Sequence, residues 1–169
     1  EAFRKKGHDA WSCDLLNTEI PGQHIQGNVL DILNNGWDLL IAHPPCTYIT
    51  VANSRNWYEK RKEQKEALEF VIELMNAPIE KICVENPVGA ISTRIKKPTQ
   101  IIQPYMFGHE ETKKTCLWLW GLPRLVPTHV YPTGTKFPIY KANNSYTNRW
   151  MDRSRTYQGI ANAMAEQWG

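Results

Sequence analysis

Residues 37–46, with the sequence WDLLIAHPPC, decide how the rest of the chain is interpreted. Residues 38–42 predict a buried strand. The Pro44-Pro45 pair after it predicts a rigid turn, because proline fixes φ and has no N–H to donate. Cys46 then comes at the carboxyl end of a strand, where ligands and catalytic groups gather in open α/β sheets. From these residues alone, Cys46 is either a nucleophile or a small apolar residue packed beside the turn.

Composition predicts one ordinary folded domain over residues 1–169, since 41% of the residues are hydrophobic and 22% charged. No run of about eighteen apolar residues occurs, so no membrane span is predicted. Residues 1–11 lack the pattern of a signal peptide, which predicts a cytoplasmic protein. The four cysteines form no CxxC pair, and this argues against a metal site. The net charge of +3 permits a phosphate-bearing partner.

A second strand is predicted at residues 80–85, EKICVE, and its end meets Asn86-Pro87. The apolar spacing between the two strands predicts a helix over residues 56–77. A strand, a helix and a strand of these lengths form a βαβ unit, whose strands are parallel. Because parallel strands share their carboxyl edge, we expect Cys46 and Glu85 to face one cleft.

The other expected elements are short. A helix end at residues 1–6 is closed by Gly7, and a strand at residues 8–13 is followed by Asp14. Asp14 either holds a ribose, as acids at this place do in doubly wound folds, or is a solvated turn residue. Because the chain starts in mid-helix, we expect a preceding strand and loop to be missing. We also expect two further strands, at 24–26 and 112–120, and two further helices, at 28–33 and 156–168. Residues 47–55 are expected to form a polar loop and residues 125–150 an irregular segment.

Five short motifs together resemble the cytosine-5 DNA methyltransferases. They are PPC at 44–46, ENP at 85–87, QGN at 26–28, FGHEETKKT at 107–115 and GIANAM at 159–164. They occur in the family's order across nearly the whole chain. The chain is most similar to the small methylase-like proteins of phages and prophages, which implies a prokaryotic or phage-infected cell.

The resemblance implies a doubly wound, mostly parallel sheet of the Rossmann-like methyltransferase fold, without its first strand. It implies that the Cys46 thiolate adds to carbon 6 of cytosine, which makes carbon 5 nucleophilic. Glu85 then protonates or hydrogen-bonds ring nitrogen 3. Lys113 stands where the family has an arginine that supports the base, and a lysine there loses the bidentate fork.

The resemblance also implies S-adenosylmethionine as the cofactor and DNA as the partner. The implied cofactor-binding residues are Asp14, Asn28, Pro44 and Asn162, and Asn28 would reach the adenine amino group through its amide oxygen. The target base leaves the duplex or comes from single-stranded DNA. Residues 125–150 replace a larger target-recognition region. The implied DNA-binding residues are Thr47, Lys114, Arg149, Arg153 and Arg155.

Two alternatives stay open from the sequence. One is a degenerate methylase fold that binds DNA without catalysis. Three features favour it: the expected absence of the first strand and its loop, Asn28, and Lys113. The presence of both Cys46 and Glu85 argues against it. The other is an amino-methyltransferase of DNA, whose (D/N)PP(Y/F) motif ends the same strand. The HPPC sequence lacks both the acid or amide and the aromatic of that motif.

Overall fold

The structure is a computed structural model that describes residues 1–132 and 155–169. The chain falls into two compact units, and each is described by itself. The sheet unit consists of Trp11–Ile101 and Lys114–Arg124, and the helix unit of Glu1–Ala10, Ile102–Lys113 and Leu125–Gly169. Whether the two units act as the single domain that the composition predicts stays a prediction.

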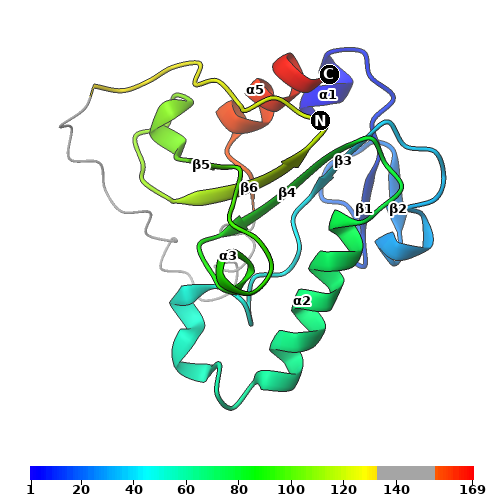
Figure 1. Ribbon diagram of the computed structural model, residues 1–169. Helices are drawn as coiled ribbons and strands as arrows, with labels where there is room; N and C mark the ends of the chain where they lie inside the picture. Colours follow the sequence, from blue (N-terminus) through cyan, green and yellow to red (C-terminus); the bar gives the residue numbers. More distant parts are fainter. Residues whose placement is uncertain (133–154) are drawn as a thin grey trace. The chain divides into compact units, whose positions relative to one another are not determined.

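A four-stranded sheet organises the sheet unit (Figure 1). Its order is β3 (Leu39–Ala42), β4 (Lys81–Pro87), β6 (Thr115–Trp120) and β5 (Gln100–Ile102), of which the last residue, Ile102, is counted with the helix unit. Strands β3 and β4 are parallel, with Ile41 in register with Cys83, and this confirms the predicted βαβ unit.

Strand β6 runs antiparallel to β4 and pairs Leu117 with Glu85, so the sheet is mixed. The α/β class predicted from the sequence is therefore confirmed, and mixed sheets are common in such folds. Strand β6 begins at Thr115, three residues after the predicted start at 112. Its residues Thr115 to Leu119 are all buried, as expected of a strand with a neighbour on each side.

A second, two-stranded parallel sheet pairs β1 (Ser12–Asp14) with β2 (His24–Gln26). Strand β1 is shorter than the prediction at 8–13 and includes Asp14, whereas β2 lies where it was predicted. The expected helix at 28–33 is a single 3₁₀ turn, η1 (Val29–Asp31). The Asn28 side chain caps this turn by accepting from the Leu30 N–H at 3.1 Å.

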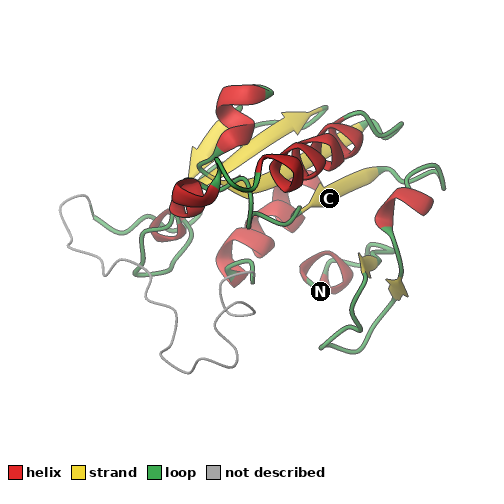
Figure 2. Cartoon of the chain, turned by 90° about the horizontal axis from the view of Figure 1, so that it is seen from below, coloured by secondary structure: helices red, strands yellow, loops and turns green. Residues whose placement is uncertain are grey.

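Helix α2 (Arg61–Met75) connects β3 to β4 and begins five residues later than predicted. It buries Gln64, Leu68, Val71, Leu74 and Met75, which follow helical spacing along one side. Figures 1 and 2 show this helix lying along the strands of the sheet, and its apolar side joins the core formed with β3 and β4. Each fully buried leucine contributes about 1.5–3 kcal/mol to folding.

The segment after Cys46 is tied back to the end of β4. It was predicted as a polar loop over 47–55, but Ile49 is fully buried in the core, and residues Val51–Asn56 form the 3₁₀ helix η2. Thr50 and Gly89 form an isolated antiparallel bridge, and the Ala90 N–H donates to the Ile49 carbonyl at 2.7 Å. Ala90 is the first residue of α3 (Ala90–Arg94). The two chain segments that leave the carboxyl edge of β3 and β4 are therefore bound to each other.

The helix unit contains α1 (Ala2–Lys5), the 3₁₀ turn η3 (Pro104–Met106) and α5 (Gln158–Trp168). Gly7 has φ of +90° after α1, which confirms the predicted glycine stop. Helices α1 and α5 are in contact, and Lys6 is paired with Glu166. Of the irregular segment expected at 125–150, the described residues 125–132 form no helix or strand, and the remainder lies outside the described residues.

Within residues 1–132 and 155–169, none of the helices combines the length and the apolar character that crossing a membrane requires.

The close approach at Gly89 gives a test of this packing. A Cβ built on Gly89 would lie 2.0 Å from the Ile49 carbonyl oxygen, which is backbone and cannot rotate away. We expect Gly89→Ala to lower the free energy of unfolding by about 1–3 kcal/mol, as overpacking does. Urea denaturation measures the change.

The matched control is Gly27→Ala, because a Cβ there meets nothing within 4 Å. We expect that control to stay within about 0.5 kcal/mol of the wild type. Equal stability of the two variants would contradict the packing of the Gly89 segment against Ile49.

Candidate active site

Two side-chain hydrogen bonds join the carboxyl ends of β3 and β4. His43 Nδ1 lies 2.8 Å from Glu85 Oε2, and Asn86 Nδ2 donates to the Pro44 carbonyl oxygen at 2.8 Å. Both bonds run from the HPPC turn to the ENP sequence at the end of β4. They bring together the two motifs that the sequence predicted would face one cleft.

The His43–Glu85 pair lies at the rim of the sheet unit. The Glu85 side chain is 19% exposed and that of His43 is 39% exposed. In the tautomer of His43 that carries its proton on Nδ1, this nitrogen donates to Oε2. A bond to a charged acceptor is shorter and stronger than a neutral one. Glu85 is thus held at one oxygen, Oε2.

Cys46 is half-buried and follows directly on this turn. Its carbonyl oxygen accepts from the N–H groups of Ile49 and Thr50 at 3.1 and 2.9 Å, which fixes the backbone after the cysteine. The Cys46 side chain also packs against the apolar core. The two interpretations made from the sequence, nucleophile and small apolar residue, are both compatible with this position.

The other three thiols are held in environments that disfavour the thiolate. Burial, and then the negative charge of Glu85, raise the pKa of the Cys83 thiol. Burial also raises the pKa of the Cys116 thiol. Burial, followed by the charges of Asp14 and Asp31, raises the pKa of Cys13. Because the thiolate is the nucleophile, these three are poor candidates for the reactive cysteine.

Asp14 is the last residue of β1, and Asn28 follows two residues after the end of β2, so both lie at the carboxyl edge of this parallel pair. Asp14 is exposed, and its Oδ1 accepts from the Leu16 N–H at 2.9 Å, which leaves Oδ2 to accept from a ligand. The Oδ1 of Asn28 caps η1, so one lone pair of this oxygen and the two N–H groups of Nδ2 remain. A carboxylate and an amide at one strand edge suit the hydroxyls and the base of a nucleoside.

The remaining predicted residues of the sheet unit have different surroundings. Pro44 is buried, and its carbonyl is used by Asn86. Thr47 is exposed, and its carbonyl oxygen accepts from Asn53 Nδ2 at 2.7 Å. Lys114 is exposed at the start of β6. Thr47 and Lys114 are therefore accessible, as contacts with DNA require.

The helix unit carries three further predicted residues. Lys113 is half-buried, with Nζ 5.7 Å from the centre of the Tyr157 ring. Asn162 lies on the exposed side of α5, and its Oδ1 accepts from Gln158 Nε2 at 2.7 Å. Arg155 is exposed. Arg149 and Arg153 lie outside the described residues.

Tyr157, which carries Lys113 over its ring, is itself held in place. Its hydroxyl donates to the Glu111 carboxylate, and its ring meets that of His109 edge to face at a centroid distance of 5.0 Å. The Gly159 N–H donates to His109 Nε2 at 3.0 Å, at the start of α5. The FGHEETKKT motif is thereby joined to the segment that opens α5.

Sequence reasoning missed His43 and the structural part played by Asn86. A histidine directly before the diproline was a usable signal, because it places a titratable group at the carboxyl end of a strand. Asn86 is 2% exposed, and its Oδ1 has no partner among the described residues. Asn86 therefore stabilises the fold through Nδ2, whose hydrogen bond to the Pro44 carbonyl oxygen fixes the turn before Cys46.

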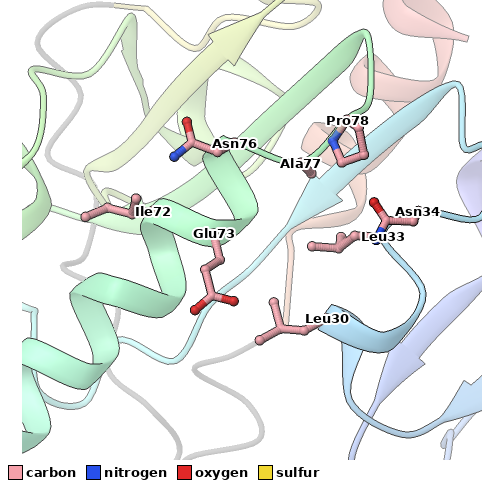
Figure 3. A pocket seen from close by; sticks show the side chains of 8 residues that line it. All are labelled: Leu30, Leu33, Asn34, Ile72, Glu73, Asn76, Ala77 and Pro78. Atoms are coloured by element: carbon pink, nitrogen blue, oxygen red, sulfur yellow. The ribbon is translucent and has the colours of Figure 1, made fainter.

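A shallow hollow of about 350 Å³ lies elsewhere in the sheet unit (Figure 3). Leu30 and Leu33 line it before β3, and Glu73, Ala77 and Pro78 line it at the end of α2, before β4. These residues precede the two strands, so the hollow lies at their amino ends. It is therefore distinct from the edge that carries His43 and Glu85.

No protein family model, no curated protein and no solved structure matches this chain.

Over the described ranges 1–132 and 155–169, no cluster of three or more His, Cys, Asp or Glu side chains could hold a metal ion.

The buried Asn86–Pro44 bond can be tested by its removal. Asn86→Ala leaves the Pro44 carbonyl without its donor, and we expect a loss of about 1–3 kcal/mol in unfolding free energy. Asn53→Ala is the matched control, because it removes a bond of the same kind, from an amide to the Thr47 carbonyl, at the surface. We expect the control to cost less than about 1 kcal/mol. If the two variants lose the same stability, Asn86 does not anchor the turn.

Thiol reactivity tests the environments of the cysteines. At about pH 8 the raised pKa values leave Cys83 and Cys116 as neutral thiols, whereas half-buried Cys46 can reach a reagent. We expect iodoacetamide to modify Cys46 in the native protein at least about tenfold faster than Cys83 or Cys116. Peptide mass spectrometry follows each site, with Cys46→Ser as the control. Modification of Cys83 as fast as Cys46 would contradict the burial described here.

Proposed function

We propose that the protein transfers a methyl group from S-adenosylmethionine to carbon 5 of cytosine in DNA. The observation that carries the proposal is the pair of bonds between the HPPC turn and the ENP sequence. These bonds bring the segment that holds the candidate nucleophile Cys46 to the end of the strand that holds the candidate acid Glu85.

The reaction begins when the Cys46 thiolate forms a bond to carbon 6 of the cytosine ring. The electron pair of the ring double bond moves toward nitrogen 3, where Glu85 delivers a proton, and carbon 5 becomes nucleophilic. After carbon 5 has taken the methyl group, nitrogen 3 returns its proton to Glu85. A water molecule then takes the proton of carbon 5, the ring double bond forms again, the bond from sulfur to carbon 6 breaks, and Cys46 leaves as the thiolate. The acid step contributes about 10²–10⁴-fold to the rate.

S-Adenosylmethionine supplies the electrophilic methyl group when it is bound. The residues that would hold it are Asp14, through Oδ2 on the ribose hydroxyls, and Asn28, through its free amide positions on the adenine. Their surroundings support this assignment, since each uses one side-chain oxygen for the fold and keeps polar atoms for a ligand.

The DNA substrate would meet exposed residues of the sheet unit. Thr47 follows Cys46, and Lys114 is an exposed cation that suits phosphate oxygens; in the helix unit, Arg155 is exposed as well. The target cytosine must leave the base stack to reach Cys46, because carbon 6 is covered within a duplex. A mismatched or single-stranded cytosine costs less to bring out, and is therefore the better first substrate to test.

The test is an assay of methyl transfer with the full gene product. Radiolabelled S-adenosylmethionine is incubated with single-stranded and double-stranded DNA that contains cytosine, and nucleoside analysis locates the label. We expect 5-methylcytosine with the wild type and a loss of at least about 10³-fold with Cys46→Ser, which removes the nucleophile. Glu85→Gln should lose about 10²–10⁴-fold.

A second candidate function is DNA binding without catalysis. The packing of Cys46 against the apolar core favours it, since a small buried thiol needs no chemical role. In that case no label reaches cytosine with any protein, while the folded wild type retains DNA in a binding assay. That pair of results would replace the catalytic proposal.

A further inference from the structure

We propose that His43 is the positioning residue that orients Glu85 and stabilises its carboxylate as the proton leaves. This inference rests on the proposed function and adds a residue to it. Its basis is the 2.8 Å hydrogen bond between His43 Nδ1 and Glu85 Oε2 at the carboxyl edge of β3 and β4.

The hydrogen bond gives the two carboxyl oxygens of Glu85 different surroundings. Oε2 is held by His43, and no other hydrogen bond to the carboxyl group is found among the described residues. Oε1 is left to face a substrate. The backbone of Glu85 is fixed on both sides, because β4 pairs with β3 and with β6. A carboxyl group fixed at its backbone and at one oxygen presents the other oxygen in a defined direction.

The ionisable groups around Glu85 come from all three strands. His43 follows β3, Cys83 precedes Glu85 on β4, and Cys116 lies on β6 beside the residue that pairs with Glu85. Burial raises the pKa of both thiols, so they stay neutral. His43 is therefore the member of this set that can donate to a charged carboxylate.

The chemistry gives this bond more strength in the transition state than in the ground state. Before reaction, the neutral acid carries its proton on Oε1 and accepts from His43 at Oε2. When nitrogen 3 of the cytosine takes the proton, Glu85 becomes a carboxylate, and the same Nδ1–H now donates to a charged oxygen. Only interactions that strengthen in this way accelerate the chemical step.

Because His43 is exposed, its effect on the reaction can be distinguished from an effect on folding. A pair in which one side chain is 39% exposed contributes little to folding. The Asn86–Pro44 bond ties the same two segments independently. Removal of the imidazole should therefore leave the fold in place, so the kinetic effect can be measured on a folded protein.

The kinetic test uses three variants in the methyl-transfer assay. His43→Ala should lower kcat by about ten- to a hundredfold, with KM for DNA within about twofold. His43→Asn should recover most of the rate, because its amide can donate from the position of Nδ1. His8→Ala is the control, since His8 is an exposed histidine of the helix unit. The His43→Ala, Glu85→Ala double variant should be no slower than Glu85→Ala alone.

A spectroscopic test needs neither cofactor nor DNA. NMR of the imidazole nitrogens should show the proton of neutral His43 on Nδ1. Glu85→Ala should return His43 to protonation mainly on Nε2, the form favoured in free imidazole side chains. His24 serves as the internal reference, because its Nε2 lies 3.0 Å from the Leu16 carbonyl oxygen and must carry the proton.

These outcomes separate the inference from the proposed function. A wild type that transfers no methyl group overturns the catalytic part together with the proposed function, and the orienting bond is then judged by NMR alone. Methyl transfer that is unaffected by His43→Ala overturns the inference and leaves the proposed function standing. His43 protonated on Nε2 in the wild type overturns the orienting bond itself.

Discussion

The parallel pairing of β3 and β4 is the constraint on which the candidate site depends. Parallel strands end at the same edge, so the HPPC turn and the ENP sequence meet although about forty residues separate them. Helix α2 makes this pairing possible, because a parallel connection needs a long crossover. The apolar side of α2 holds the two strands in one core. The polar groups at the edge are thus brought together by the pairing of β3 with β4 and by the packing of α2.

Hydrogen bonds at the strand ends fix the positions of the groups that the strand pairing brings together. Asn86 fixes the backbone at Pro44, two residues before Cys46, and His43 fixes the carboxyl group of Glu85. The Thr50–Gly89 bridge continues the connection beyond both motifs. Each bond joins the segment after β3 to the segment that ends or follows β4. In the proposed reaction, the nucleophile Cys46 and the acid Glu85 must keep a constant separation to act on one ring, and these bonds would maintain it.

The sequence predicted the parts of this arrangement that follow from the spacing of apolar residues and from the order of strand, helix and strand along the chain. The spacing of Leu68, Val71, Leu74 and Met75 indicated the helix, and its length between two strands indicated parallel pairing. Strand direction for β6 did not follow, because apolar alternation is the same in both directions. Ile49 was mistaken for a loop residue, since one apolar side chain in a polar segment has no period. The partner of His43 lies about forty residues away, and no local pattern reports such a contact.

The proposed reaction requires a covalent bond between Cys46 and cytosine, and a trapped adduct would reveal that bond. With fluorine in place of hydrogen at carbon 5, the final proton loss is blocked and sulfur stays bonded to carbon 6. The full gene product would be incubated with S-adenosylmethionine and 5-fluorocytosine DNA, digested, and analysed by mass spectrometry. We expect a nucleotide adduct on the peptide that contains Cys46 and no adduct with Cys46→Ser. An adduct on another cysteine, or methylation without any adduct, would contradict it.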